Sequence, residues 1–163
     1  MDASRVGDVA AFINKLPRPL RPRALSKMVA LVVPYVGTTG LVIERLDRER
    51  VIGVARNRRR ARNHIGGVHA AASVLLAETV TGFLVAMNLP GDKLPLIKTM
   101  HADFLRRARG DIRAETWLEE EQRRLLQQEP KGAIDVAVQL SDASGAEPIR
   151  CTMTWAWIPR RRR

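Results

Sequence analysis

One carboxylic acid, Glu78, lies inside the only long apolar stretch of the sequence, residues 68–89. A carboxylate held away from water can serve as a general base or as a nucleophile, and its burial otherwise needs a reason. Two further polar residues, Asn63 and His69, lie where the chain enters this stretch. If the stretch is a helix, the unbonded amides of its first turn offer a site for developing negative charge. The residues therefore supply a base or nucleophile and, separately, a place to hold an anion.

The stretch that carries Glu78 predicts a helix from about residue 68 to residue 89 that is apolar, and therefore buried, on nearly every face. Alanine and leucine dominate it, and Pro90-Gly91 follows it as a stop signal. Its length of about 33 Å is also that of a membrane span. A carboxylate near the centre of such a span costs roughly 2.5–3.5 kcal/mol. We therefore expect the core helix of a soluble protein and no membrane partner.

The composition indicates one domain without disulfides. A chain of 163 residues, 45% of them hydrophobic, is long enough for one core and short for two. The single cysteine, Cys151, cannot form an intrachain disulfide, and residues 1–17 lack the apolar core of a signal peptide. No spacing of His, Cys and acidic residues indicates a metal site, and nothing implies a cofactor. We expect a cytoplasmic protein.

Basic residues outnumber acidic ones by 28 to 17, and the excess is clustered at residues 56–62, 106–113 and 160–163. Such a surface attracts anions, whether nucleic acid, anionic lipid or a phosphorylated small molecule. A merely solvated surface is the alternative. We expect no specific nucleic-acid partner, because binding through the last four arginines would be nonspecific and would weaken steeply with salt.

Runs of β-branched and apolar residues predict two strands before the central helix and four after it. Short turns join them, which favours antiparallel pairing. The fold class is therefore α+β, with a six-stranded antiparallel sheet curled around one helix. Helices are expected at 8–16, 22–33, 68–89 and 119–129, and strands at 40–46, 50–55, 94–107, 112–118, 133–140 and 149–158.

The chain is expected to divide into an N-terminal helical segment (1–19), a single domain (20–158) and a basic tail (159–163). One curled sheet leaves part of a central helix open. We therefore expect a second subunit to cover it in a homodimer, and a tetramer is also possible.

The layout, together with the spacing Asn63-x5-His69-x8-Glu78, resembles the hotdog-fold acyl-CoA thioesterases over roughly residues 20–158. The likeness is to the phenylacetate-pathway type and to a related branch of uncharacterised hotdog domains. In that superfamily the loop before the central helix carries Asn, a glycine-containing turn and His. An acidic residue follows nine positions after the His.

The resemblance places the turn of this motif at Gly66 and Gly67. It places Ala70 where many relatives have a glycine whose amide faces the thioester carbonyl. Alanine keeps that amide, with a tighter approach for the substrate. A weaker match covers residues 100–110, similar to the family's strand after the helix. Its arginines are expected to reach the phosphates of a thioester carrier: Arg106, Arg107 and Arg109.

The resemblance implies hydrolysis of an acyl-CoA thioester, which needs an oxyanion donor and a carboxylate that attacks the carbonyl or activates water. Glu78 would be the base or nucleophile, and the amide near Ala70 the donor. Asn63 would bind the carbonyl or the water, and His69 would orient the loop. Because Ala70 and Glu78 lie about 12 Å apart along one helix and roughly 80° apart around it, the two groups would come from different subunits.

Other interpretations stay open. Glu78 could be a structural carboxylate hydrogen-bonded to Asn63 or Thr81. The chain could also be a hotdog hydratase or dehydratase, or a noncatalytic module that binds acyl-CoA or nucleic acid, because fold alone does not fix function. The acyl group is left open as well.

Overall fold

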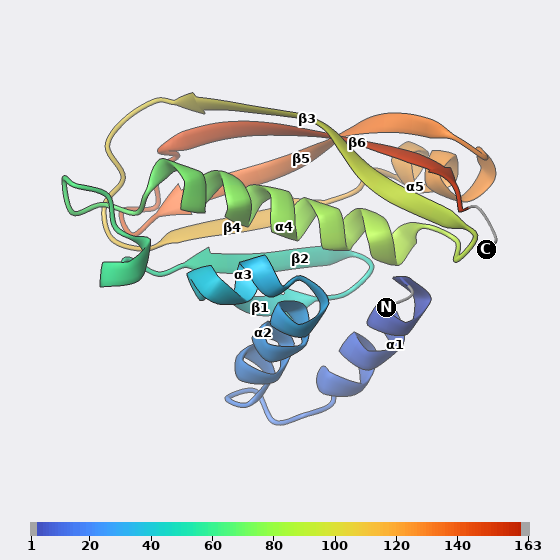
Figure 1. The fold of residues 1–163 in the computed structure, drawn as a ribbon, viewed down its shortest axis with the longest axis horizontal. Coiled ribbons are helices and arrows are strands. Elements are labelled where there is room, and N and C mark those ends of the chain that lie inside the picture. The colour runs from blue at the N-terminus through green and yellow to red at the C-terminus, as the bar shows by residue number, and fades with distance from the viewer. Residues whose placement is uncertain (1–2, 161–163) are drawn as a thin grey trace.

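A six-stranded antiparallel sheet curls around one long helix, α4 (Figure 1). This computed structural model describes residues 3–160. The strand order is β1-β2-β4-β5-β6-β3, and every neighbouring pair is antiparallel. The predicted α+β architecture is therefore confirmed. The strands are β1 (Val42–Leu46), β2 (Arg50–Ala55), β3 (Lys93–Phe104), β4 (Ile112–Trp117), β5 (Gly132–Asp142) and β6 (Ile149–Pro159).

The helices agree with the predicted ones except near the N-terminus. The first helix lies several residues earlier than the predicted 8–16. Helix α3 has no counterpart among the predicted elements; Pro34, which directly follows the helix predicted at 22–33, begins this new helix at its first position. The helices are α1 (Ala3–Ile13), α2 (Arg21–Val32), α3 (Pro34–Thr39), α4 (Ala70–Asn88) and α5 (Glu120–Gln128), with a 3-10 turn at Arg59–Ala61.

Helix α4 presents two different faces. One face is fully buried at Leu76, Val80 and Leu84. Gly53 on β2 permits close packing here, because a Cβ atom at that position would lie 2.9 Å from the side chain of Leu76. The burial is incomplete within one chain, and burial on nearly every face stays a prediction for the assembled subunits. The other face is a half-buried stripe of residues four positions apart, Val74, Glu78, Gly82 and Ala86.

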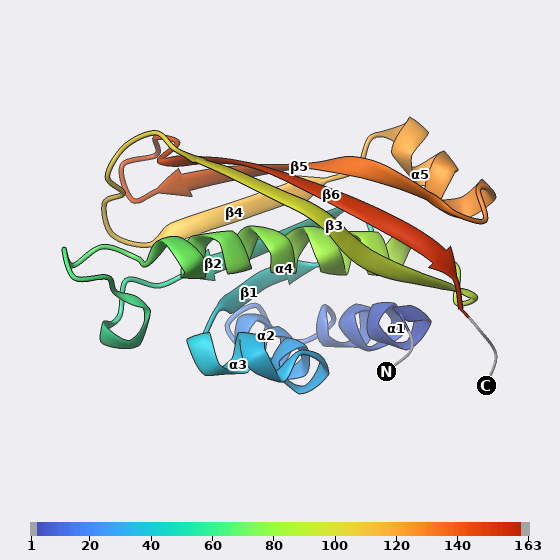
Figure 2. The same cartoon turned by 45° about the horizontal axis from the view of Figure 1, so that its top comes forward.

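Helices α1 and α3 pack against α4, and α2 packs beside β1 and α3 (Figure 1, Figure 2). Their inward side chains, among them Val6, Ala10, Val29 and Val36, are buried in the same apolar core as α4. Helix α2 thereby covers one edge of the sheet. The division of the chain at residue 19 stays a prediction.

The other edge strand, β3, has no covering element within residues 3–160. Its apolar side chains are exposed to between 37% and 55%, and they include Leu96, Ile97, Met100 and Phe104. An exposed apolar edge strand is a template for pairing with another chain. This edge and the half-buried stripe of α4 are the surfaces that the expected homodimer would cover.

Two further expectations concern α4 and the basic tail. Helix α4 is long and apolar enough to span a membrane, but most of it is buried inside the fold, as in the core helix of a soluble protein. Strand β6 includes Pro159, which was expected in the tail. Residues 161–163 of that tail lie outside the described residues.

Candidate active site

The loop before α4 is held together by Asn63. Its side-chain Oδ1 accepts hydrogen bonds from the amides of Ile65 (3.1 Å) and Gly67 (3.0 Å). The backbone of Asn63 also bonds to Gly66 and Gly67 across the turn, where Gly66 takes a left-handed conformation with φ of 80°. The Nδ2 group of Asn63 has no hydrogen-bond acceptor among the described residues. That group is placed to donate to a carbonyl or a water molecule.

His69 caps the N-terminus of α4. Its Nδ1 accepts the amide hydrogen bond of Ala71 at 3.1 Å, and its carbonyl oxygen accepts that of Ser73. Because Nδ1 is the acceptor, the neutral ring carries its proton on Nε2. The amides of Ala70 and Ala72 have no acceptor within residues 3–160, and they lie at the positive end of the helix dipole. The geometry fits the expected orienting role of His69 and leaves the amide of Ala70 open to an anion.

A buried carboxylate, Asp142, fixes the arginine loop that follows β3. The guanidinium of Arg106 and the amide of Arg109 each donate to its Oδ2 at 2.8 Å. The amide and hydroxyl of Ser144 donate to Oδ1. Burial alone would raise the pKa of Asp142, but hydrogen bonds from Ser144, Arg109 and Arg106 hold that pKa well below its usual range. Asp142 is therefore an ionised anchor for the loop.

The three arginines expected to bind phosphates differ in how they are used. Arg106 is paired with Asp142. Arg107 donates one hydrogen bond to the carbonyl oxygen of Ile65. The guanidinium of Arg109 has no hydrogen-bond partner in the described part of the chain. Arg109, followed by Arg107, is therefore better placed than Arg106 to receive an anionic ligand.

Two adjoining cavities lie between the N-terminus of α4 and this loop. One, of about 330 Å³, is lined in part by Asn63, Ala70 and Phe104. The other, of about 590 Å³, shares Gly67 and residues 106–108 with the first. The structure therefore brings most of the predicted site residues together, namely Asn63, Gly66, Gly67, Ala70, Arg106, Arg107 and Arg109.

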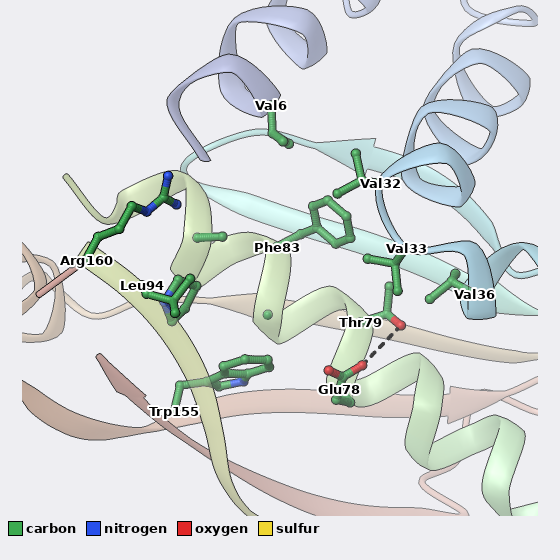
Figure 3. A pocket seen from close by; sticks show the side chains of 13 residues that line it. Val6, Val32, Val33, Val36, Glu78, Thr79, Phe83, Leu94, Trp155 and Arg160 are labelled. Carbon is green, nitrogen blue, oxygen red and sulfur yellow. Dashed lines mark hydrogen bonds between the residues drawn. The ribbon is translucent and has the colours of Figure 1, made fainter. Parts of the chain in front are cut away.

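Glu78 lies apart from that cluster, in a cavity of about 230 Å³ on the half-buried side of α4 (Figure 3). Figure 3 shows its carboxyl group beside the hydroxyl of Thr79, with Val33 and Val36 nearby and Leu94 toward the opposite end. Of the described lining residues, only Glu78 and Arg160 are charged. The apolar lining comes from α1–α3, α4, β3 and β6, and includes Val6, Val32, Val36, Phe83, Leu94 and Trp155.

The carboxylate of Glu78 has no basic partner among the described residues. Its one hydrogen bond is a long contact of 3.5 Å from the hydroxyl of Thr79. Burial raises the pKa of Glu78, and the Thr79 hydroxyl offsets that rise only in part. The alternative structural partners are wrong, because Asn63 bonds to its own loop and the hydroxyl of Thr81 donates to the backbone carbonyl oxygens of Ala77 (2.8 Å) and Glu78 (3.1 Å).

A single chain does not bring Glu78 to the open amide of Ala70. The two residues are eight positions apart on one helix, about 12 Å along its axis. They also line different cavities. A site that uses both groups on one carbonyl is therefore incomplete within one chain.

Two parts of the site are missing from the sequence-based prediction: Asp142, which has a weak signal, and the apolar cavity, which has none. Asp142 stands in Asp-Ala-Ser-Gly, a pattern that predicts a turn, in which Asp commonly bonds to a nearby amide. The apolar cavity gathers Val36, Phe83 and Trp155 from distant segments, so no local pattern could indicate it. No group of three or more His, Cys, Asp or Glu residues that could hold a metal ion occurs within residues 3–160.

Residues 21–158 match the family described as "Domain of unknown function (DUF4442)". No curated protein matches the sequence. A solved protein of unknown function from Pseudomonas aeruginosa, described as a probable thioesterase, is 27% identical, with a TM-score of 0.76 over 89% of this chain and 97% of that one.

Two further solved structures show the same fold at lower identity. A thioesterase from Haemophilus influenzae is 16% identical, with a TM-score of 0.66 over 85% of this chain and 90% of that one. A mutant of a second thioesterase from P. aeruginosa is 18% identical, with a TM-score of 0.65 over 83% and 94%. The chain therefore has the hotdog fold that its sequence predicts.

Proposed function

We propose that this chain, which belongs to the DUF4442 family, hydrolyses an acyl-CoA thioester at a site shared by two identical subunits. Solved relatives of the same fold are described as thioesterases or probable thioesterases, which supports this class of reaction. The observation that carries the proposal is that α4 presents two groups that are open to a ligand. Within residues 3–160, Ala70 offers an amide without an acceptor, and Glu78 offers a half-buried carboxylate without a basic partner.

Glu78 can act in two ways. As a general base it takes a proton from water while the water oxygen bonds to the thioester carbon, and the amide of Ala70 from the other subunit holds the oxyanion. The carbon–sulfur bond then breaks, and the proton passes from Glu78 to the departing thiolate. As a nucleophile the carboxylate itself displaces the thiolate, and water then cleaves the resulting anhydride. A raised pKa brings its proton affinity nearer to working pH, which favours the first role.

The open edge of β3 is the surface through which we expect the two subunits to join. Pairing of this strand with its counterpart would continue the sheet and bury the apolar side chains of Leu96, Ile97 and Met100. It would also bring a second central helix toward the half-buried stripe of α4. Light scattering should then give at least twice the chain mass of 18.2 kDa. A stable, active monomer would contradict the shared site.

The larger polar cavity is the proposed position of the carrier's phosphates. The guanidinium of Arg109 has no partner in the part of the chain that the structure describes, and Arg109 lines this cavity together with Arg107. Arg106 is a positioning residue in this account, because its guanidinium is bound to Asp142. The cluster at residues 56–62 adds positive charge beside the cavity, which Asn57 lines.

The test is release of free thiol from a panel of short, long and aryl acyl-CoAs. Glu78→Gln keeps the shape of the side chain but removes its charge, so turnover of the best substrate should fall by roughly 100-fold or more. Glu120→Gln, at an exposed position on α5, is the matched control and should behave as wild type. The dimer state and melting temperature of both variants are measured alongside.

Other outcomes favour the remaining interpretations. Near wild-type turnover in a folded Glu78→Gln dimer would show that the carboxylate is structural, and would leave Asn63 or a strand residue to carry the chemistry. Binding of acyl-CoA without release of thiol from any substrate would indicate a noncatalytic module. Tight, sequence-selective nucleic-acid binding that survives deletion of residues 160–163 would also indicate a binding module.

A further inference from the structure

The N-terminal helices close one side of the apolar cavity beside Glu78. Val6 of α1, Val32 of α2 and Val36 of α3 line it opposite Phe83 of α4. Val6 and Val36 are only 4% and 3% exposed, so these helices are anchored in the core. The wall is therefore a fixed part of the fold.

The other side of the cavity is fixed by Trp155. Its indole N–H donates a 2.9 Å hydrogen bond to the buried hydroxyl of Thr81, which holds the ring in place. The ring packs so closely on α4 that a Cβ atom at Gly82 would lie 2.7 Å from it. The glycine thus permits the ring to pack closely against the helix and to form part of the apolar wall.

The cavity has the length and volume of a medium-length alkyl chain. Its lining follows α4 from Glu78 through Gly82 to Ala86, about 12 Å at 1.5 Å per residue. An extended chain advances about 1.2 Å per bond, so this length corresponds to about ten bonds. A cavity of about 150 Å³ holds the six carbons of benzene, so by proportion 230 Å³ holds about nine carbons.

We propose that this cavity binds a straight, saturated acyl chain of about eight to ten carbons, and that helices α1–α3 form one wall of its binding site. The carbonyl lies at Glu78, and the methyl end points toward Ala86 and Leu94. Apolar side chains make up most of the lining, so each methylene that enters is removed from water. The inference rests on the proposed function and adds the substrate class.

The first test measures binding without turnover. Saturated acyl-CoAs with four to sixteen carbons are titrated into the Glu78→Gln dimer by calorimetry. Affinity should rise about fourfold for each added methylene until the cavity is filled, near ten carbons, and then level off or fall. Affinity that does not depend on chain length would overturn the inference.

The second test fills the far end of the cavity. Ala86→Leu places three more carbons there and keeps a good helix former on α4. Binding of decanoyl-CoA should fall about tenfold relative to hexanoyl-CoA, the scale of one methylene too many in an apolar pocket. Ala133→Leu, on an exposed position of β5, is the matched control and should leave this ratio unchanged. An equal effect of both substitutions would contradict the proposed position.

A third variant keeps the inference testable if Ala86→Leu does not fold. Leu94 is 38% exposed at the same end, so Leu94→Ala should be tolerated and should shift the preference toward longer chains.

The proposed function and the proposed acyl-chain cavity can fail separately. Chain-length-dependent binding that responds to Ala86→Leu, in a protein that hydrolyses no thioester, would refute the function and support the cavity. Hydrolysis with no preference for chain length would support the function and refute the cavity.

Discussion

Two carboxylates, Asp142 and Glu78, lie in opposite surroundings. Asp142 receives hydrogen bonds from Arg106, Arg109 and Ser144, and its pKa is held low. Glu78 is half-buried among apolar side chains with one long contact, and burial raises its pKa. The protein supplies hydrogen-bond donors to both carboxylate oxygens of Asp142. Glu78 is the carboxylate that can still accept a proton from a ligand.

The same contrast separates the two ends of the proposed site. At the polar end, the hydrogen bonds of Asn63 and Asp142 hold the loops on either side of the helix N-terminus, and such networks rigidify a structure. At the apolar end no described residue compensates the charge of Glu78, a condition that is common at functional sites and rare elsewhere. We infer that stability depends mainly on the polar end, while the chemistry depends on one group from each end.

The largest effect in the polar region is expected from Ala70→Pro, which removes the proposed oxyanion donor. Turnover should fall roughly 100- to 1000-fold, the scale measured for such donors. The helix should persist, because proline is favoured at its first position and His69 already has the extended backbone (ψ 141°) that precedes proline. Ala70→Gly keeps the amide and is the control. Equal thiol-release rates for the two variants would exclude this amide from the reaction.

A smaller effect, on stability instead of turnover, is expected from Asp142→Asn. The change weakens the anchor of the arginine loop and should lower the free energy of unfolding by roughly 2–3 kcal/mol, as for loss of a charged buried partner. That corresponds to a melting temperature lower by roughly 5–10 °C. Asp92→Asn, at an exposed position, is the control. An unchanged melting temperature would contradict the anchoring role.

The lowered pKa of Asp142 also predicts how the stability of this variant and of the wild type depends on pH. Asp142 stabilises the fold above its unfolded pKa of about 3.9, and this stabilisation is lost as pH falls toward the folded value. The free energy of unfolding, measured by urea titration, should therefore fall more for the wild type than for Asp142→Asn as the pH is lowered from 5. Parallel curves would show that the carboxylate is not specifically stabilised.

The smallest effect is expected from Glu78→Gln on stability, and it has the opposite sign. Because burial raises the folded pKa of Glu78, the ionised form opposes folding, and stability falls as pH rises from the unfolded pKa through the folded one. Glu78→Gln should therefore melt slightly above the wild type at pH 7, and the difference should shrink toward pH 4. A variant that melts well below the wild type at pH 7 would make Glu78 a structural anchor, like Asp142.

The sequence predicts the parts of this site that are local. The segment from Asn63 to Glu78 is one loop and one helix, so the open amide near Ala70 follows from the predicted helix start. The cap at His69 does not, because the helix is predicted from about residue 68. The arginines at 106–109 lie near it because β3 returns beside α4. The ion pair between Arg106 and Asp142 depends on a turn 36 residues later in the chain, and the sequence does not indicate this pair.

The apolar cavity could not be predicted from the sequence in the same way. Helix α3 is absent from the predicted elements, and its Val36 forms part of the wall. The half-buried stripe of α4 is likewise hidden, because its alanines and glycine look as apolar as the buried face. Periodicity shows that a helix is apolar, but it does not show which face the rest of the chain leaves open.

The most direct test of the shared site uses dimers made from two inactive subunits. Subunits with Glu78→Gln and subunits with Ala70→Pro are coexpressed with different tags, and the mixed dimers are isolated through both. One of their two sites then keeps an intact Glu78 from one chain and an intact Ala70 from the other, so turnover should recover to about half of wild type. Mixed dimers as inactive as either parent would show that the two groups do not act across the interface, and would contradict the account.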